Sequence, residues 1–237
     1  ELLRANPYPG RGIVVGRDCV YYWIMGRSAN SRNRVFVATE DGIRTEAHDP
    51  SKLEDPSLII YHPVRAMGDA LVVTNGDQTD TIYQAIQQKD RQLYDEISYP
   101  QTLRAFEKAL GSLHAGCMER SYEPDSPNFT PRISAIVQAD GSFELSLLKR
   151  QGGNDPAASD RCVREFFAYE GADARTGYFI STYQGDGNPL PSFSGEPVEV
   201  ALPAADKIWG ALDADNKVSL YANVGGKVRL YNKNLGD

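Results

Sequence analysis

Short apolar runs separated by turn residues dominate the chain and predict a protein built mainly from β-strands. The turn at Asp41-Gly42 lies between two such runs and is one of the stronger signals for a β-hairpin, and Gly225-Gly226 separates the last two runs. The expected strands cover residues 12–16, 20–25, 35–39, 43–47, 58–65, 70–74, 132–137, 143–148, 163–169, 178–183, 218–222 and 228–232.

Helical spacing is confined to a few blocks. After Asp77 or Thr79, either of which suits a helix N-cap, apolar residues recur at helical intervals. Residues 2–6, 93–97, 103–110 and 204–212 are the other expected helical segments. Hairpins with few helices favour an α+β protein with mainly antiparallel sheet, in which two sheets stack and helices lie outside. Residues 151–160 resemble a linker, but strands resume after them, so residues 1–237 are predicted to form a single domain.

Composition and charge narrow the class of protein. The chain has 237 residues, 41% of them hydrophobic, and a formal net charge of -7, which argues against a general nucleic-acid binder. No apolar run approaches the roughly 20 residues of a membrane span, and no signal-peptide pattern opens the chain. Cys19, Cys117 and Cys162 are widely spaced, which suggests neither a disulfide framework nor a zinc site. We therefore expect a cytoplasmic protein that binds neither membranes nor nucleic acid.

A polar loop at residues 26–34 is the first candidate for chemistry. It joins two apolar runs and contains three arginines, two serines and two asparagines but no acidic residue. Guanidinium groups match phosphate oxygens two at a time, and Ser and Asn add neutral donors, so the loop suits a phosphate. The alternative is a solvated turn whose arginines pair with carboxylates elsewhere, and the loop alone favours neither.

Two further loops carry candidate groups. The turn at Asn75-Gly76-Asp77 runs from a strand into a helix start, a place where backbone amides bind anions readily. The proline-rich residues 122–131 lead directly into the next strand and present Glu123, Asn128 and Arg132, where we expect catalytic groups.

Structural roles compete with these chemical ones. Glu123 alternatively is a surface carboxylate paired with Arg120 or Arg132. For Tyr61, at the end of an expected strand, the structural interpretation is a tyrosine buried in the core. His62 precedes a proline and is interpreted as structural rather than catalytic.

Four segments in chain order carry a family resemblance. They are residues 6–12 (NPYPGRG), 22–28 with 33–36 (YWIMGRS and NRVF), 75–80 (NGDQTD) and 128–133 (NFTPRI). Together they resemble the archaeal-type IMP cyclohydrolase family and its bacterial relatives, and the strand-rich remainder is compatible with that family. The chain departs from the short archaeal pattern in two places. It has extra length between the segment at 75–80 and the segment at 128–133, and it has a long loop at 185–197.

The resemblance implies a fold and a reaction. The fold is a four-layer αββα sandwich like that of the N-terminal-nucleophile hydrolases, without their self-processing. The reaction closes the six-membered ring of 5-formamidoimidazole-4-carboxamide ribonucleotide (FAICAR) to give inosine monophosphate (IMP) and water. A small-molecule purine ribonucleotide is the implied partner, no metal or organic cofactor is expected, and a homo-oligomer is permitted.

The resemblance also suggests roles for individual residues. Tyr61 and Glu123 form the expected proton-transfer pair, and Arg132 stabilises the developing oxyanion. Arg27 and Arg32 are the expected clamps for phosphate or carboxamide, with Arg34 a weaker candidate. The other expected substrate-binding residues are Asn75 and Asp77, which would contact the base or ribose, and Ser28, Asn33 and Asn128.

Two other functions fit the same residues. One is an amide hydrolase on this fold, which the lack of Ser, Thr or Cys at residue 1 disfavours. The other is a non-catalytic purine-nucleotide-binding protein, which would bind the nucleotide without converting it.

Overall fold

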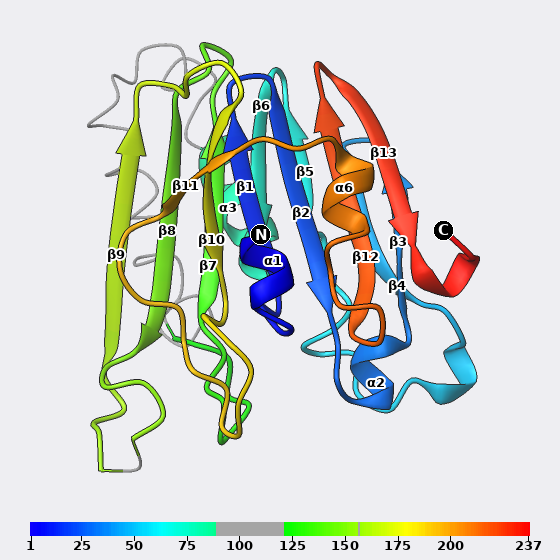
Figure 1. Cartoon of the computed structure of the whole chain (residues 1–237), viewed down its shortest axis with the longest axis vertical. Helices are drawn as coiled ribbons and strands as arrows, with labels where there is room; N and C mark the ends of the chain where they lie inside the picture. The colour runs from blue at the N-terminus through cyan, green and yellow to red at the C-terminus, as the bar shows by residue number, and fades with distance from the viewer. Residues whose placement is uncertain (89–120, 156) are drawn as a thin grey trace.

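The computed structural model describes residues 1–88, 121–155 and 157–237. Their strands form two sheets that face each other, and each strand pair among them is antiparallel (Figure 1). This confirms the predicted α+β class with mainly antiparallel sheet. The helices expected at 93–97 and 103–110 lie outside the described residues.

The two sheets, called sheet A and sheet B below, have distinct strand orders among the described residues. Sheet A runs β11 (Val198–Ala201), β10 (Thr176–Ser181), β1 (Gly12–Gly16), β2 (Cys19–Met25), β12 (Lys217–Val224) and β13 (Lys227–Asn232). Sheet B runs β3 (Arg34–Thr39), β4 (Gly42–Ala47), β5 (Val64–Met67), β6 (Ala70–Thr74), β7 (Arg132–Val137), β8 (Phe143–Arg150) and β9 (Cys162–Tyr169).

The main core lies between the sheets. In β2 every residue is buried, because successive side chains of a strand point to opposite faces and both faces of this strand are covered. Tyr22 and Ile24 belong to the core between the sheets, whereas Tyr21 and Trp23 belong to a second core on the outer face of sheet A. The apolar run is therefore that of a central strand.

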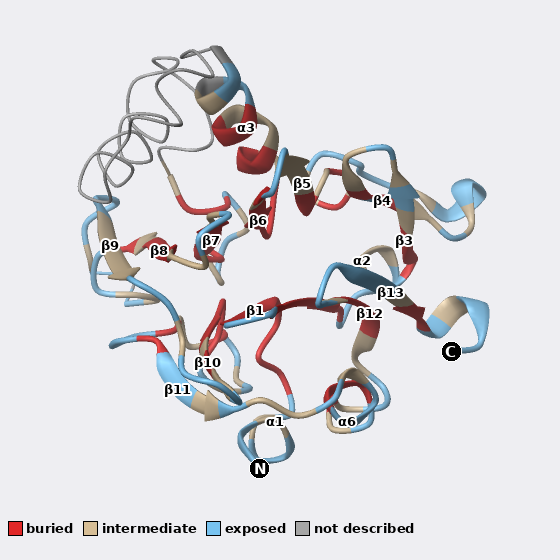
Figure 2. Cartoon of the chain, turned by 90° about the horizontal axis from the view of Figure 1, so that it is seen from above, coloured by how far each residue is buried: buried red, intermediate tan, exposed pale blue. Residues whose placement is uncertain are grey.

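Helices cover the outer faces of both sheets (Figure 2). On sheet A, α1 (Leu2–Ala5) and α6 (Ala205–Trp209) pack on the outer core through residues such as Leu3 and Ile208. On sheet B, α3 (Gln78–Gln88) packs on β5 and β6, with Ile82 buried. None of the described helices is long and apolar enough to cross a membrane.

Most expected elements are confirmed, and the main differences are in one strand, one helix end and one edge strand. The strand expected at 58–65 is wrong, since β5 begins only at Val64. The amides of Ile59 and Ile60 instead bond to the Pro56 carbonyl in a turn, and Pro63 has no N–H for a ladder. The last helix ends at Trp209 rather than at 212, and β11 was not predicted.

The two sheets are joined by chain and by side chain. Sheet A passes into sheet B through the polar loop at 26–34, which contains the short helix α2 (Ala29–Arg32). At the other end of the sequence, the buried Asn232 side chain accepts a bond from the Phe36 amide at 2.7 Å and donates to the Phe36 carbonyl at 3.1 Å. The C-terminal strand of sheet A is thus fastened to the first strand of sheet B.

Glu144 on β8 is expected to make stability depend on pH. Its side chain is 1% exposed, and burial raises its pKa from 4.5 to about 8. The folded protein therefore holds a proton that the unfolded chain releases, so this group lowers stability as pH rises from 4.5 to 8.

Glu144→Gln removes that penalty. The quantity to compare is the unfolding free energy of Glu144→Gln minus that of the wild type, measured by urea denaturation. We expect this difference to be larger at pH 9 than at pH 4 by up to about 5 kcal/mol. The exposed Glu170→Gln is the control, expected to follow the wild type at both pH values. Parallel pH dependence of wild type and Glu144→Gln would contradict the assignment.

Candidate active site

Strand ends of both sheets meet at one end of the sandwich, next to α2 (Figure 1). At this end Gly12 of β1 lies opposite Trp23 and Ser181, and Thr74 of β6 lies opposite Ser134 of β7. Seven buried polar side chains, called the inner cluster below, come from these strand ends and their loops. They are Arg11, Tyr22, Arg34, Tyr61, Asn75, Glu123 and Arg132.

Glu123 is the carboxylate of the inner cluster. Its Oε2 lies 3.6 Å from Nη2 of Arg11, and the Asn75 side-chain amide donates to its Oε1 at 3.3 Å. Burial raises the pKa of the Glu123 carboxyl, although Arg11 and Arg132 act to lower it. Burial acts to lower the pKa of Arg11, but the negative charge of Glu123 raises it well above its ordinary value. Glu123 is therefore not the surface carboxylate of the alternative interpretation.

Asn75 holds the loop that carries Glu123. Its Nδ2 donates to the Pro131 carbonyl at 2.9 Å as well as to Glu123, and its Oδ1 accepts from the Ile133 amide at 2.8 Å and from Gln78 Nε2 at 3.0 Å. An asparagine side chain has two donor hydrogens and two acceptor lone pairs. Asn75 uses all four within the protein.

Tyr22 and Tyr61 form a buried hydroxyl pair between the sheets. Their hydroxyl oxygens lie 2.8 Å apart, and either one can donate to the other. Burial, followed by the proximity of Tyr61, raises the pKa of Tyr22 well above its ordinary value. Tyr61 is buried, as the alternative interpretation expected, but its hydroxyl lies in a polar cluster rather than in an apolar core.

Arg34 is a buried cation without a carboxylate partner among the described residues. Its side chain is 0% exposed, and its Nε donates to the Ser31 carbonyl at 2.8 Å. In the described part of the chain, neither Nη1 nor Nη2 has a hydrogen-bond partner. Burial lowers the pKa of Arg34, and the charge of Arg11 lowers it further, while Tyr61 and Tyr22 oppose the shift.

Arg132 is better satisfied. Its Nε donates to the Ser121 carbonyl, and its Nη1 donates to Asp77 at 3.0 Å and Gln78 at 2.7 Å. Its Nη2, like Nε of Arg11, is buried and has no partner within the described ranges. Three guanidinium groups thus surround one fully buried carboxylate, so the inner cluster carries a positive excess that suits an anion.

The polar loop at 26–34 forms the rim of this end. Arg27 is exposed, donates to Asp186 at 2.7 Å and to the Gly187 carbonyl at 3.0 Å, and lies over the Tyr8 ring. Arg32 is also exposed and donates to the Gly26 carbonyl and to Asn216. The arginine-carboxylate pairing of the alternative interpretation is thus present for Arg27.

Ser28 and Asn33 shape the same loop. Ser28 is the N-cap of α2, where its hydroxyl accepts from the Ser31 amide at 3.1 Å. The Asn33 side chain donates to the Asp49 carbonyl and accepts from the Asp49 amide, both at 2.8 Å. The side chains of both residues therefore form hydrogen bonds with backbone groups of the protein.

Asn128 and Tyr183 connect the neighbouring loops. Asn128 Oδ1 accepts from the Leu190 amide at 3.1 Å, which joins the loop at 122–131 to the loop at 182–193. The Tyr183 hydroxyl bonds to the Thr130 hydroxyl, and its ring stacks on that of Tyr8 with centroids 5.9 Å apart. The rim residues and the inner cluster are therefore parts of one connected end of the molecule.

The structure thus sorts the predicted site residues into two groups. The first group belongs to the inner cluster and consists of Tyr61, Asn75, Glu123 and Arg132, with Asp77 bonded to it. The second group lies in the loops around the cluster and consists of Arg27, Ser28, Arg32, Asn33 and Asn128. Sequence reasoning did not single out Arg11 and Tyr22, and it gave Arg34 only as a weaker candidate. Arg11 and Tyr22 stand inside the segments that carry the family resemblance, which was the available signal. His62 pairs with Asp80 at 3.0 Å, and within the described residues no hydrogen bond joins its side chain to the inner cluster.

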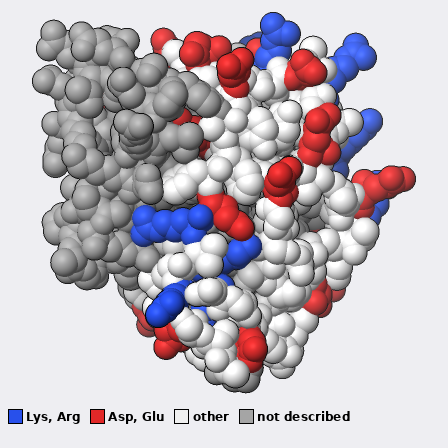
Figure 3. Space-filling view, turned by 90° about the vertical axis from the view of Figure 1, so that its left-hand side faces the viewer, with Lys and Arg blue, Asp and Glu red and all other residues white. Residues whose placement is uncertain are grey.

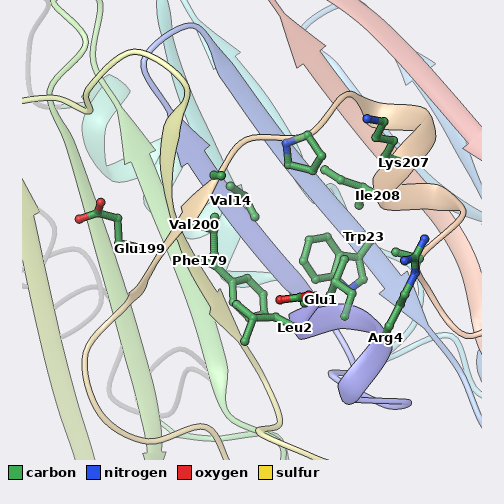
Figure 4. Close-up of a pocket in the computed structure, with 14 residues that line it drawn as sticks. Glu1, Leu2, Arg4, Val14, Trp23, Phe179, Glu199, Val200, Lys207 and Ile208 are labelled. Carbon is green, nitrogen blue, oxygen red and sulfur yellow. The ribbon is translucent and has the colours of Figure 1, made fainter.

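A cavity of about 500 Å³ lies on the other side of sheet A (Figure 4). Apolar side chains such as Val14, Trp23, Phe179 and Ile208 line it. Trp23 follows Tyr22 in β2 and so points to the opposite face of the sheet. This cavity is therefore separate from the inner cluster.

Neither the charged side chains on the face in Figure 3 nor the possible metal ligands among the described residues indicate a second site. The described part of the face in Figure 3 carries both acidic and basic side chains rather than a continuous basic surface. Among the described residues, no group of three or more His, Cys, Asp and Glu side chains is arranged to hold a metal ion.

The inner cluster combines the groups needed for proton transfer on an anionic substrate. Glu123 and the two tyrosine hydroxyls can hold or donate a proton, and the unpartnered guanidinium N–H groups can bind oxygen atoms. Burial strengthens each of these interactions because little water competes.

Comparison with known proteins agrees with this chemistry. The family model described as IMP cyclohydrolase-like protein matches residues 8–227. The chain is 28% identical over 163 residues to the IMP cyclohydrolase of Methanocella arvoryzae, an alignment that covers 66% of this chain and 71% of the relative. It is 24% identical over 182 residues to that of Methanococcus aeolicus, covering 75% and 74%. It is 30% identical over 142 residues to that of Methanococcus maripaludis, covering 57% and 61%. Since the family match spans nearly all of the sequence, this chain belongs to the IMP cyclohydrolase-like protein family.

Proposed function

We propose that the protein is an IMP cyclohydrolase, which closes the ring of FAICAR to give IMP and water in purine biosynthesis. The observation that carries the proposal is the buried Arg34 guanidinium, whose two terminal nitrogens lack partners within the described residues, next to Glu123, Arg11 and the tyrosine pair. An unpaired buried charge is costly to stability, so its presence favours a role in binding an oxygen-rich substrate.

The reaction needs proton movement rather than a new reagent. The carboxamide nitrogen bonds to the formyl carbon and loses one proton, while the formyl oxygen takes up a proton and becomes a hydroxyl. That hydroxyl then leaves as water with one more proton, as the formamido nitrogen loses its hydrogen and the ring C=N bond forms. The two reacting groups belong to one molecule, so holding them in contact supplies a large part of the acceleration.

The inner cluster supports a division of these tasks. Glu123 and Tyr61 transfer the protons, because a buried carboxyl with a raised pKa and a buried hydroxyl pair are suited to it. Arg34, with Arg132 and Arg11, stabilises the negative charge that develops on the formyl oxygen. Asn75 uses its whole hydrogen-bonding capacity within the protein, so we assign it to holding Glu123 instead of the base.

The rim supports the binding of the nucleotide's phosphate and ribose. Arg27 and Arg32 are the proposed phosphate clamps, and Asp77, half-exposed beside Arg132, is the proposed ribose contact. Ser28, Asn33 and Asn128 support these contacts by holding the loops, as their bonds to backbone groups indicate.

The test is to mix the purified protein with FAICAR and follow IMP formation by absorbance. Formation by the wild type, slowed in Tyr61→Phe, is the expected result. If no IMP forms while purine monophosphates still raise the unfolding temperature, the protein is a nucleotide-binding protein and the proposal is wrong.

Arg27→Ala is expected to weaken IMP binding by about 1.5–3 kcal/mol, because a charge-assisted bond to phosphate is lost. Isothermal titration calorimetry measures the change. Arg44→Ala is the matched control, since Arg44 is also exposed and paired with a carboxylate, Glu46, but lies outside the rim. Equal affinities of wild type and Arg27→Ala would remove Arg27 from the phosphate site.

The proposal also covers the fold, the domain organisation, the cellular location and the oligomeric state of the protein. Two facing sheets with helices on both outer faces support the four-layer αββα sandwich of the N-terminal-nucleophile hydrolases. The core between the sheets draws on residues from Ile13 to Tyr221, which supports one domain over 1–237. The free thiols of Cys19 and Cys162 support a cytoplasmic location. Sedimentation of the purified protein tests for a homo-oligomer.

A further inference from the structure

Thr45 stands where β4 and the chain leading to β5 separate. Gly42 and Ile43 of β4 pair with β5. Two residues further along, Thr45 is 0% exposed and faces the segment at 59–61, which is not a strand. Pro63 prevents a regular ladder here, because it has no N–H to donate. The backbone of Tyr61 therefore needs another means of attachment to sheet B.

Thr45 supplies that attachment with both its main chain and its hydroxyl. The Tyr61 amide donates to Thr45 Oγ1 at 2.8 Å, and the Thr45 amide donates to the Tyr61 carbonyl at 2.9 Å. The hydroxyl in turn donates to the Ile59 carbonyl at 2.7 Å, with the Tyr61 carbonyl a longer alternative at 3.1 Å. One hydroxyl thus acts as acceptor and donor at once, which a valine of the same shape cannot do.

The segment at 59–61 also borders a cavity. Its volume is about 440 Å³, and Thr45, Ile60 and Tyr61 are among the residues that line it. At the other end of the Tyr61 side chain, the hydroxyl lies 2.8 Å from that of Tyr22. Tyr22 is fixed in the middle of sheet A, opposite Ile13 of β1 and Tyr221 of β12. The position of the Tyr61 hydroxyl thus depends on Tyr22 at one end and on Thr45 at the other.

We propose that Thr45 is a positioning residue that holds the Tyr61 hydroxyl in place for proton transfer. The inference rests on the proposed function, since it assigns Tyr61 a role in the same reaction. Thr45 itself lies behind the Tyr61 backbone and is not assigned a contact with the substrate.

A double-mutant cycle tests the proposal with kcat for IMP formation as the readout. Thr45→Val in the wild type is expected to lower kcat by about 10-fold to 100-fold with KM unchanged, because a small displacement of a reacting group costs that much. In the Tyr61→Phe background the same change is expected to lower kcat no further, because the hydroxyl that it positions is already absent. Thr45→Ser keeps the hydroxyl and is expected to restore kcat. Thr39→Val, at a half-buried threonine of the adjacent strand β3, is the control.

The outcomes separate this role from a structural one. Equal losses of kcat in the two backgrounds, or a Thr45→Ser variant as slow as Thr45→Val, would overturn the positioning role. If Thr45→Val does not fold, Thr45→Ala takes its place in the cycle with the same expectations. Wild-type protein that forms no IMP from FAICAR would overturn the proposed function itself, a result that the wild-type assay gives before any variant is made.

Discussion

Glu123→Gln is expected to lower kcat for IMP formation by about 100-fold to 10,000-fold, the range typical of a lost general acid or base. Glutamine keeps the shape and the bond from Asn75 but cannot exchange a proton. Stopped assays of IMP formation measure the loss. Binding of IMP is expected to persist, since Arg27 and Arg32 are unchanged.

The pH profile gives a second measure of the same group. Burial raises the pKa of Glu123, so its protonated form persists to higher pH than that of an ordinary carboxyl. If this form is the acid, kcat/KM of the wild type falls as pH rises through the raised pKa, and Glu123→Gln lacks this fall. Glu46→Gln, at a carboxylate outside the inner cluster, is the control and is expected to keep the wild-type profile. Full activity in Glu123→Gln would contradict the role.

Arg34→Met is expected to make the protein more stable and less active. A buried cation without a charged partner is costly to the folded state, so an apolar side chain of similar length is expected to raise the free energy of unfolding. The same change is expected to lower kcat/KM by about 100-fold or more, since it removes a preorganised donor from the oxyanion. Urea denaturation and the IMP assay measure the two effects on the same preparation.

Arg150→Met is the matched control for this trade-off. Arg150 is also a buried arginine, but its guanidinium donates to the carbonyls of Gly153, Asp155 and Ala158 and approaches Asp160. Its replacement leaves those carbonyls without donors, so it is expected to destabilise the fold. If Arg34→Met destabilises the protein as Arg150→Met does, the Arg34 guanidinium stabilises the fold, and the expected trade-off is wrong.

Local signals predicted most of the strands. The hairpin of β3 and β4 follows from Asp41-Gly42 between two apolar runs, and that of β12 and β13 from Gly225-Gly226. The strand expected at 58–65 failed because its apolar residues suit a strand as well as a buried turn, and periodicity alone cannot separate the two. The turn is fixed by Pro63 and by the Thr45 side chain, which lies 16 residues from Tyr61.

The site was harder to predict than the fold because its contacts span both sheets. Arg11 meets Glu123, and Tyr22 meets Tyr61, only after sheet A has packed on sheet B. Within its own segment, Tyr22 is one apolar residue among seven consecutive buried positions, so nothing local separates it from Tyr21. Arg34 showed the same limit, since its missing partners are a property of the folded surroundings.

The strand order of sheet A bears on how the protein is made in the cell. The strand that carries Tyr22 receives its neighbour β12 from the far end of the chain, and Asn232 reaches Phe36 across 196 residues of sequence. While the chain is still on the ribosome, β2 therefore has one free, apolar edge, which is a hazard for aggregation until the last strands emerge. Sheet A can therefore be completed only after β12 has been made.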